Sequence, residues 1–394
     1  MPQTSRTPPS SNDRNCGLDT LRAAAIALVF MYHYMVFVSR QPTFGWASVV
    51  GWMGVDLFFV LSGYLIGNQL FAGLARGQRI SLGAFYARRA FRTLPVFWVV
   101  LALYFLFPSI MGGNAPPPLW RFLTFTQNIG LPPGTAFSHA WSLCIEEQFY
   151  LVLPLVLVAG ARCAARRWHG WALMALSLCL GVGARSWLWR SYGLQSGNVA
   201  GYMPWVYYAT LCRFDEFLPG LAVAMLRNFH RPLWERISAH GNALLVTGTA
   251  ATAAMFVLAF HRYYIDGYGY GFFMTAFGYS LGAMAFALLV AAALSPTSWL
   301  RRLRIPGAFH LALWSYAIYL SHKPIAFIVH QQFKSLNVDP GLELAVVIAA
   351  SLAGGWLLHR LVEAPFMAWR DRHVSSSFVT AAIRAWPVSG TSPG

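Results

Sequence analysis

The sequence predicts an all-α protein that crosses a membrane about ten times, with both termini in the cytoplasm. The first observation is the composition: 57% of the 394 residues are hydrophobic and only 11% are charged. This composition is typical of membrane proteins and excludes a disordered chain. The second is a series of apolar runs, each long enough to cross about 30 Å of hydrocarbon. The third is that basic loops alternate with loops that carry few charges.

The predicted spans are apolar runs separated by polar or proline-containing segments. They cover residues 18–38, 49–70, 93–110, 142–161, 170–188, 204–226, 242–260, 271–294, 308–330 and 342–361. Segment 1–14 is polar and lacks the apolar core of a signal peptide, and segment 374–394 is similar in composition. We therefore expect flexible tails at 1–14 and 374–394, and a single membrane domain over 15–373.

Arginines set the predicted orientation. If the N-terminus is cytoplasmic, most of the 29 Lys and Arg fall in cytoplasmic segments, and each of these segments contains arginine. The opposite loops carry isolated basic residues. This pattern follows the positive-inside rule, which explains the net charge of +16 better than nucleic-acid binding does. We expect a multi-pass protein of the plasma (inner) membrane, with the lipid bilayer and no nucleic acid among its partners.

Two ionisable residues stand in the first predicted span. Arg22 and His33 are eleven residues apart, which is close to three helical turns, so they share one face of the helix. They lie roughly 16 Å apart along its axis. Ionisable groups at membrane depth are costly and mark candidate functional sites. Separate packing or interfacial hydrogen bonds are the alternative for each residue.

Three carboxylates are expected at the level of His33. Asp56 lies near the outer end of the second span, and Glu146 and Glu147 lie in the first turns of the fourth. A carboxylate beside a histidine orients the ring and raises its basicity, as a general base requires. A structural polar network that fixes helix packing, or a proton relay in a transporter, would use the same residues.

A second polar cluster is predicted at the cytoplasmic face. Arg88, Arg89 and Arg92 precede the third span, and the last two share a helix face. Arginine side chains bind phosphate bidentately, so these residues and Arg22 are candidates for a phosphate site. The alternatives are a topogenic anchor for the run and a local pair between Arg22 and Asp19. No metal-binding pattern of Cys and His occurs, and we expect no metal site.

An ordered set of motifs resembles the acyltransferase-3 family of integral membrane acyltransferases. The matching segments are the Arg-x10-His pair Arg22 and His33, the Phe-Phe-x-x-Ser-Gly segment at 58–63, the Arg-x-x-Arg motif at 89–92, the Trp-Ser-Leu-x-x-Glu block at 141–146, and looser C-terminal blocks at 315–324 and 362–366. Lys323 follows His322 at a position that the family often fills with an apolar or aromatic residue. The resemblance covers residues 15–370.

The resemblance implies an acyl-CoA donor as cosubstrate, most simply acetyl-CoA, with no bound cofactor. It implies that His33 is catalytic and that Arg22, Arg89 and Arg92 bind the donor. We expect the neighbouring Arg88 to bind the donor with them. It also implies ten core spans. Many members carry a fused extracytoplasmic hydrolase-like domain, which we do not expect in this sequence.

Together, these patterns lead to the hypothesis of an O-acyltransferase that acts on a hydroxyl of an extracytoplasmic or membrane-associated carbohydrate-type acceptor. His33 would deprotonate the acceptor hydroxyl or carry the acyl group transiently, and Glu146, Glu147 or Asp56 would orient it. The residues expected to line the channel are Phe58, Phe59, Ser62, Gly63, Trp141 and Ser142, with Gly63 allowing close backbone approach. The competing hypothesis is a proton-coupled transporter of a small metabolite or glycan intermediate.

Overall fold

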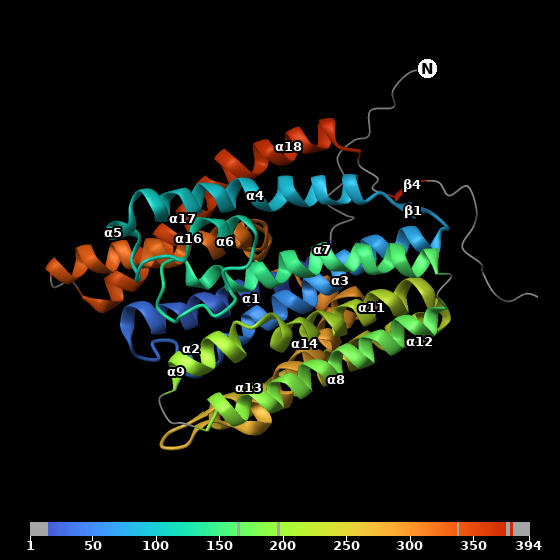
Figure 1. Ribbon diagram of the computed structural model, residues 1–394, viewed down its shortest axis with the longest axis horizontal. Coiled ribbons are helices and arrows are strands. Elements are labelled where there is room, and N and C mark those ends of the chain that lie inside the picture. The colour runs from blue at the N-terminus through green and yellow to red at the C-terminus, as the bar shows by residue number, and fades with distance from the viewer. Residues whose placement is uncertain (1–14, 164–165, 195–197, 337–338, 376–378, 381–394) are drawn as a thin grey trace, which may run out of the picture.

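The computed structural model describes residues 15–163, 166–194, 198–336, 339–375 and 379–380. Almost all of this part of the chain is helical, and most long helices run roughly along one common direction, as in a bundle (Figure 1). The predicted tail 1–14, and most of the predicted tail 374–394, lie outside the described residues. Of the second tail, Val379–Thr380 forms a strand, β4, that pairs antiparallel with β1, Arg79–Ile80.

The first half of the described chain supplies five long helices and three short ones. Its helices are α1 (Cys16–Tyr34), α2 (Trp46–Val50), α3 (Met53–Ala75), α4 (Leu82–Leu106), α5 (Pro108–Met111), α6 (Leu119–Leu123), α7 (Trp141–Arg162) and α8 (Arg167–Tyr192). A π-helical turn, Met35–Ser39, extends α1, and a 3₁₀ turn, Ser138–Ala140, leads into α7.

The second half alternates short and long helices. It contains α9 (Val199–Tyr202), α10 (Thr210–Arg213), α11 (Leu218–Phe229), α12 (Arg231–Ser238), α13 (Gly241–Arg262), strands β2 (Tyr264–Ile265) and β3 (Gly269–Tyr270), α14 (Tyr279–Leu294), α15 (Trp299–Arg302), α16 (Ala308–Leu336), α17 (Pro340–Leu358) and α18 (Ala364–His373). Further π-helical turns are Met203–Tyr207, Met274–Gly278 and His359–Glu363, and a 3₁₀ turn spans Phe214–Phe217.

Eight of the ten predicted spans coincide with helices that are long and apolar enough to cross a membrane, among the described residues. The span predicted at 308–330 lies in α16, whose 29 residues are long enough, but whose buried polar side chains lower its hydropathy. The span predicted at 204–226 is wrong as one helix. It is divided into the π-helical turn Met203–Tyr207, α10, the 3₁₀ turn Phe214–Phe217 and α11. The break occurs because this segment carries a buried charge cluster around Arg213.

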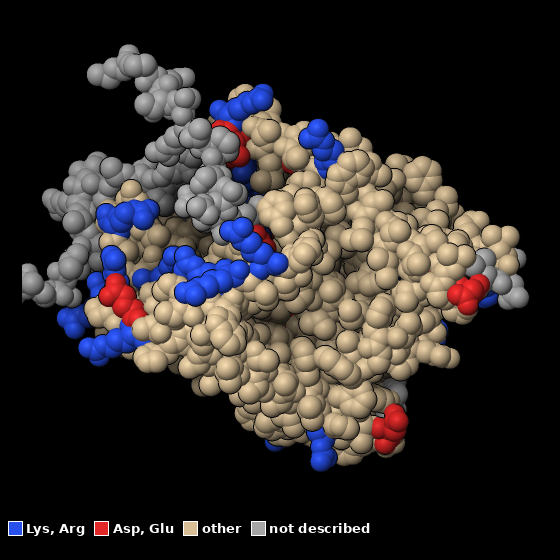
Figure 2. All heavy atoms as spheres, turned by 180° about the vertical axis from the view of Figure 1, so that it is seen from behind, with Lys and Arg blue, Asp and Glu red and all other residues tan. Residues whose placement is uncertain are grey.

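Burial separates the centre of the bundle from its periphery. α3 and α14 bury 67% and 72% of their most apolar stretches, whereas α8 buries only 17% of its own. Large apolar side chains are exposed on the outer helices, including Trp187 and Leu361. On the face in Figure 2, Lys and Arg gather toward one end and a broad region carries no charge. These features suit a bundle whose sides contact lipid.

The central contact is the crossing of α3 and α11. A Cβ on Gly63 would collide with the backbone carbonyl of Phe217, and a Cβ on Gly220 would collide with that of Val60. The two glycines therefore allow the two backbones to touch, as small residues do at helix interfaces in membranes. The close approach expected at Gly63 is confirmed.

Candidate functional site

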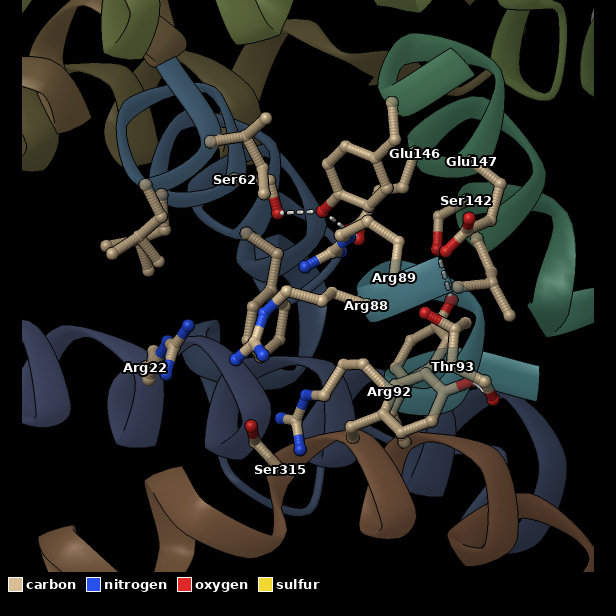
Figure 3. Close-up of a pocket in the computed structure, with 18 of the residues that line it drawn as sticks. Arg22, Ser62, Arg88, Arg89, Arg92, Thr93, Ser142, Glu146, Glu147 and Ser315 are labelled. Carbon is tan, nitrogen blue, oxygen red and sulfur yellow. Dashed lines mark hydrogen bonds between the residues drawn. The ribbon is translucent and has the colours of Figure 1, made fainter. Parts of the chain in front are cut away.

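A pocket of about 530 Å³ lies between α1, α3, α4, α7, α16 and α18, and it contains all four arginines that were predicted to bind phosphate. In Figure 3, Arg22 enters from one side, Glu146, Glu147 and Ser142 lie across from it, and the arginines of α4 lie between. Five of the nine residues that the sequence placed in the channel or in the acid cluster line this pocket: Phe58, Ser62, Ser142, Glu146 and Glu147. We call this cavity the arginine pocket.

The arginines of α4 differ in their partners. Arg88 donates to Asp371 of α18 at 3.1 Å, and Arg92 forms an ion pair with Glu363. Arg89 lies with its guanidinium 4.0 Å from the centre of the Tyr150 ring. Its guanidinium lines the arginine pocket and forms no hydrogen bond or ion pair in the described part of the chain. Arg89 therefore retains hydrogen-bonding capacity for an anionic ligand.

Tyr150 connects the acids of α7 to α3. Its hydroxyl lies 2.9 Å from Glu146 Oε2 and 2.9 Å from Ser62 Oγ. Glu146 and Glu147 thus face the arginine pocket rather than the imidazole of His33. At the end of the pocket, Ser142 Oγ lies 2.6 Å from the hydroxyl of Tyr319, which donates to the carbonyl of His139.

Three histidines meet directly behind Tyr319. His33 from α1, His139 before α7 and His322 from α16 have ring centroids 5.0 to 6.1 Å apart. The Tyr319 ring, which lines the arginine pocket, lies 5.7 Å from that of His139. We call these three residues the histidine group. It adjoins the arginine pocket through the shared wall of Tyr319.

The hydrogen-bond network assigns the tautomer of His33. A carbonyl oxygen can only accept, so His322 Nδ1–H donates to Ile318 O at 2.8 Å. In the neutral ring, His322 Nε2 must then accept, and it lies 2.7 Å from His33 Nδ1. His33 therefore carries its proton on Nδ1. Its Nε2 keeps a lone pair, as a general base or nucleophile requires.

His139 and Lys323 complete this region. His139 Nε2 bonds to Leu320 O at 3.2 Å, while its Nδ1 is buried without a partner among the described residues. Lys323 is also buried, donates to Ser138 Oγ at 3.1 Å, and lies 4.2 Å from the centre of the Phe37 ring. Sequence reasoning did not select either residue. The only signals were the position of His139 shortly before the Trp-Ser-Leu block and the polar block around His322.

The predicted carboxylate partner of His33 is wrong, because His322 occupies that place. Asp56 Oδ1 instead accepts from Arg213 at 2.5 Å, and Arg213 also pairs with Glu216, all three being fully buried. A buried guanidinium requires acidic partners, which explains why the Asp56 carboxylate pairs with Arg213 and not with His33.

Three residues predicted to line the channel do not line the arginine pocket. Phe59 is fully buried and stacks on Phe217 at 4.6 Å between ring centroids, and Gly63 packs against the backbone of α11. Trp141 lies 5.1 Å from the Arg213 guanidinium and so belongs to the charge cluster. Packing at the α3–α11 crossing accounts for Phe59 and Gly63, and packing on Arg213 accounts for Trp141.

Comparison with known proteins identifies the chain at the level of its family. The family model described as "Acyltransferase domain" matches residues 15–360. The chain belongs to the acyltransferase-3 family. This family transfers acyl groups, so the pocket and the histidine group lie in an acyltransferase domain.

Two relatives of this acyltransferase-3 protein have informative names. Peptidoglycan O-acetyltransferase OatA of Listeria monocytogenes serovar 1/2a is 29% identical over 370 residues, which are 88% of this chain and 55% of the relative. O-acetyltransferase OatA of Staphylococcus aureus is 26% identical, over 89% of this chain and 56% of the relative. The chain thus spans little more than half the length of these relatives. No solved structure matches it significantly.

Proposed function

We propose that this acyltransferase-3 protein is a membrane O-acyltransferase that moves an acetyl group from acetyl-CoA to a hydroxyl of a carbohydrate acceptor. The observation that carries the proposal is the contact between the arginine pocket and the histidine group at Tyr319. Anion-binding groups and a base with a free lone pair thereby adjoin each other. The names of the relatives support acetyl as the acyl group and a peptidoglycan-like glycan as the acceptor.

The arginine pocket would bind the phosphates of the donor. Arg22, Arg88, Arg89 and Arg92 supply positive charge, and Arg89 has unused donors. Arginine binds phosphate through paired N–H donors, which a lysine cannot reproduce. The pantetheine arm would extend past Ser142 and Tyr319 toward His33. Arg22 and His33 lie roughly 16 Å apart along α1, a separation that suits a long donor with an anionic head and a reactive end.

His33 would then act on the acceptor. Its Nε2 takes the proton of the acceptor hydroxyl while the oxygen attacks the thioester carbonyl. The new C–O bond forms and the C–S bond breaks, and the His33 imidazolium returns its proton to the departing sulfur, so that CoA leaves as the free thiol. His322 acts as a positioning residue, because its bond to His33 Nδ1 keeps Nε2 unprotonated.

The proposed location follows from the donor. Acyl-CoA is made in the cytoplasm, so the arginine pocket would open there, and the charged end in Figure 2 would face inward, in the inner membrane. The histidine group would lie deeper, toward an extracytoplasmic acceptor.

A transport assay separates this proposal from the proton-coupled transporter. The purified chain is reconstituted in vesicles and supplied with [¹⁴C]acetyl-CoA outside and a glycan acceptor on either side. The enzyme produces labelled, ester-linked acetate on the glycan and releases CoA in equal amount. Uptake of a metabolite with no labelled ester and no free CoA would contradict the proposal.

A further inference from the structure

A group of aromatic side chains with polar hydroxyl or indole N–H groups lies on the side of the histidine group away from the arginine pocket, and the proposed function does not yet use it. Five aromatic side chains from four parts of the chain meet there: Trp52 before α3, Trp141 at the start of α7, Tyr207 and Tyr208 after α9, and Tyr270 in β3. We call them the aromatic cluster. Trp141 lies 4.9 Å from Tyr207 and 5.4 Å from Tyr208 between ring centroids. Trp52 lies 6.2 Å from Tyr207.

Tyr263 joins Tyr270 to the others. Its ring centroid lies 4.5 Å from that of Trp52 and 5.5 Å from that of Tyr270. The hydroxyl of Tyr263 bonds to Tyr279 at 3.0 Å, so this residue is internally satisfied. The five members of the cluster differ from Tyr263 in the hydrogen bonding of their hydroxyl or indole N–H groups.

Each member is more than nine-tenths buried, yet its polar atom has no partner among the described residues. The exposed fractions run from 3% for Trp52 to 7% for Tyr208. In the described part of the chain, none of the five hydroxyl or indole N–H groups makes a hydrogen bond. None of them is among the side-chain atoms that are sealed from solvent and unpartnered. Each of these five atoms therefore keeps some solvent-accessible surface, and buried Tyr and Trp ordinarily use these groups in hydrogen bonds.

The rings are held in place from behind. The guanidinium of Arg213 lies 4.7 Å from the centre of Tyr207 and 5.1 Å from that of Trp141. Arg213 is itself fixed by buried pairs with Asp56 and Glu216. The charge cluster therefore holds these two rings in fixed positions, and fixed side chains bind a ligand at lower entropic cost than mobile ones.

Helix direction places the cluster opposite the arginine pocket. On α1, Arg22 lines the pocket and Tyr32, ten residues later, adjoins His33. On α7, Tyr150 lines the pocket and Trp141 lies nine residues earlier, about 14 Å away. Tyr32 also lies within electrostatic range of Tyr207 and Tyr208. His33 thus stands between the arginine pocket and the aromatic cluster.

We propose that the aromatic cluster is the acceptor subsite and that it binds a neutral pyranose ring of the acceptor; this inference rests on the proposed function. A pyranose has apolar C–H faces that stack on aromatic rings and hydroxyls that pair with Tyr O–H and Trp N–H groups. A lipid chain would leave those donors unpaired, which is unfavourable in a buried site. A cationic ligand would require a carboxylate, and the two acids beside the cluster, Asp56 and Glu216, are already paired with Arg213.

Binding without the donor tests the subsite. The full chain is placed in nanodiscs free of glycolipid and glycoside detergent, and chitotetraose, cellotetraose and maltotetraose are titrated in turn by calorimetry. Tyr208→Phe and Tyr270→Phe each remove a hydroxyl that makes no bond within the protein, so folding is preserved. Each should weaken the binding of the best oligosaccharide about three- to tenfold, as the loss of one hydrogen bond predicts.

Tyr86→Phe is the matched control. Its hydroxyl donates to Leu151 O at 2.8 Å, away from the cluster, so its loss should not change saccharide affinity. The proposal is overturned if none of the oligosaccharides binds, or if the two cluster variants bind like wild type. The binding measurement contains no acetyl-CoA, so it does not depend on acetyl transfer. Hydroxyl-dependent saccharide binding here, together with no labelled ester in the vesicle assay, would overturn the proposed function and leave the subsite standing.

Discussion

At the scale of single residues, Arg89 is the α4 arginine that forms no ion pair within the described part of the chain, whereas Arg88 and Arg92 each pair with an acid. Arg89→Gln should raise the KM for acetyl-CoA about 10- to 100-fold, because a hydrogen bond to a charged group contributes about 1.5–3 kcal/mol. Arg89→Lys should recover only part of the affinity, since the ammonium lacks the paired donors. Steady-state kinetics with varied donor measure both effects.

The control is Arg231→Gln, which removes an exposed arginine paired with Glu235 on α12. Its donor KM should match that of wild type. If Arg89→Gln also left the donor KM unchanged, the arginine pocket would not be the donor site.

His322 offers a test of positioning. His322→Leu removes the acceptor for His33 Nδ1–H, so the imidazole can turn or change tautomer. We expect kcat to fall about 100-fold, the lower range for a general base, with little change in donor KM. His322→Gln should recover part of kcat, because its amide oxygen can accept the same bond. Equal activity of the Leu and Gln variants would contradict this role.

At the scale of elements, the crossing of α3 and α11 determines where the site residues of α3 stand. Gly63→Ala places a methyl group against the Phe217 carbonyl, and overpacking of this kind costs about 1–3 kcal/mol. The variant should therefore show a lower melting temperature and a lower yield of folded protein, as measured by fluorescence-detected thermal unfolding.

Gly83→Ala is the comparison, because nothing lies within 4 Å of a Cβ at that position in the first turn of α4. It should unfold at or above the temperature of wild type, since alanine favours helix. A stable Gly63→Ala variant would mean that the two backbones do not touch as described.

Across the whole molecule, the sequence alone predicted the helical membrane class, most spans, and the four arginines that line the arginine pocket. Arg89 and Arg92 could be placed together because i, i+3 spacing fixes their shared face. The pairing of His33 with His322 could not be predicted, because these residues are 289 positions apart. Helix periodicity orders side chains along one helix, but it does not say which helix lies opposite.

The same limit explains the error over Asp56. Depth in the bilayer placed Asp56 at the level of His33, but it could not reveal that Arg213, in a broken helical segment, lies closer. A buried arginine within an apparent span was the available signal, since such a charge requires an acid nearby. The orientation of the chain, with both termini in the cytoplasm, stays a prediction.

The most direct measurement compares acetyl transfer and donor binding in wild type and His33→Ala. Both proteins are reconstituted in vesicles, and labelled ester on the glycan is quantified beside acetyl-CoA affinity. Our account predicts that His33→Ala loses transfer while it binds acetyl-CoA as wild type does, because the arginine pocket is intact. Transfer at the wild-type rate in His33→Ala would contradict the account.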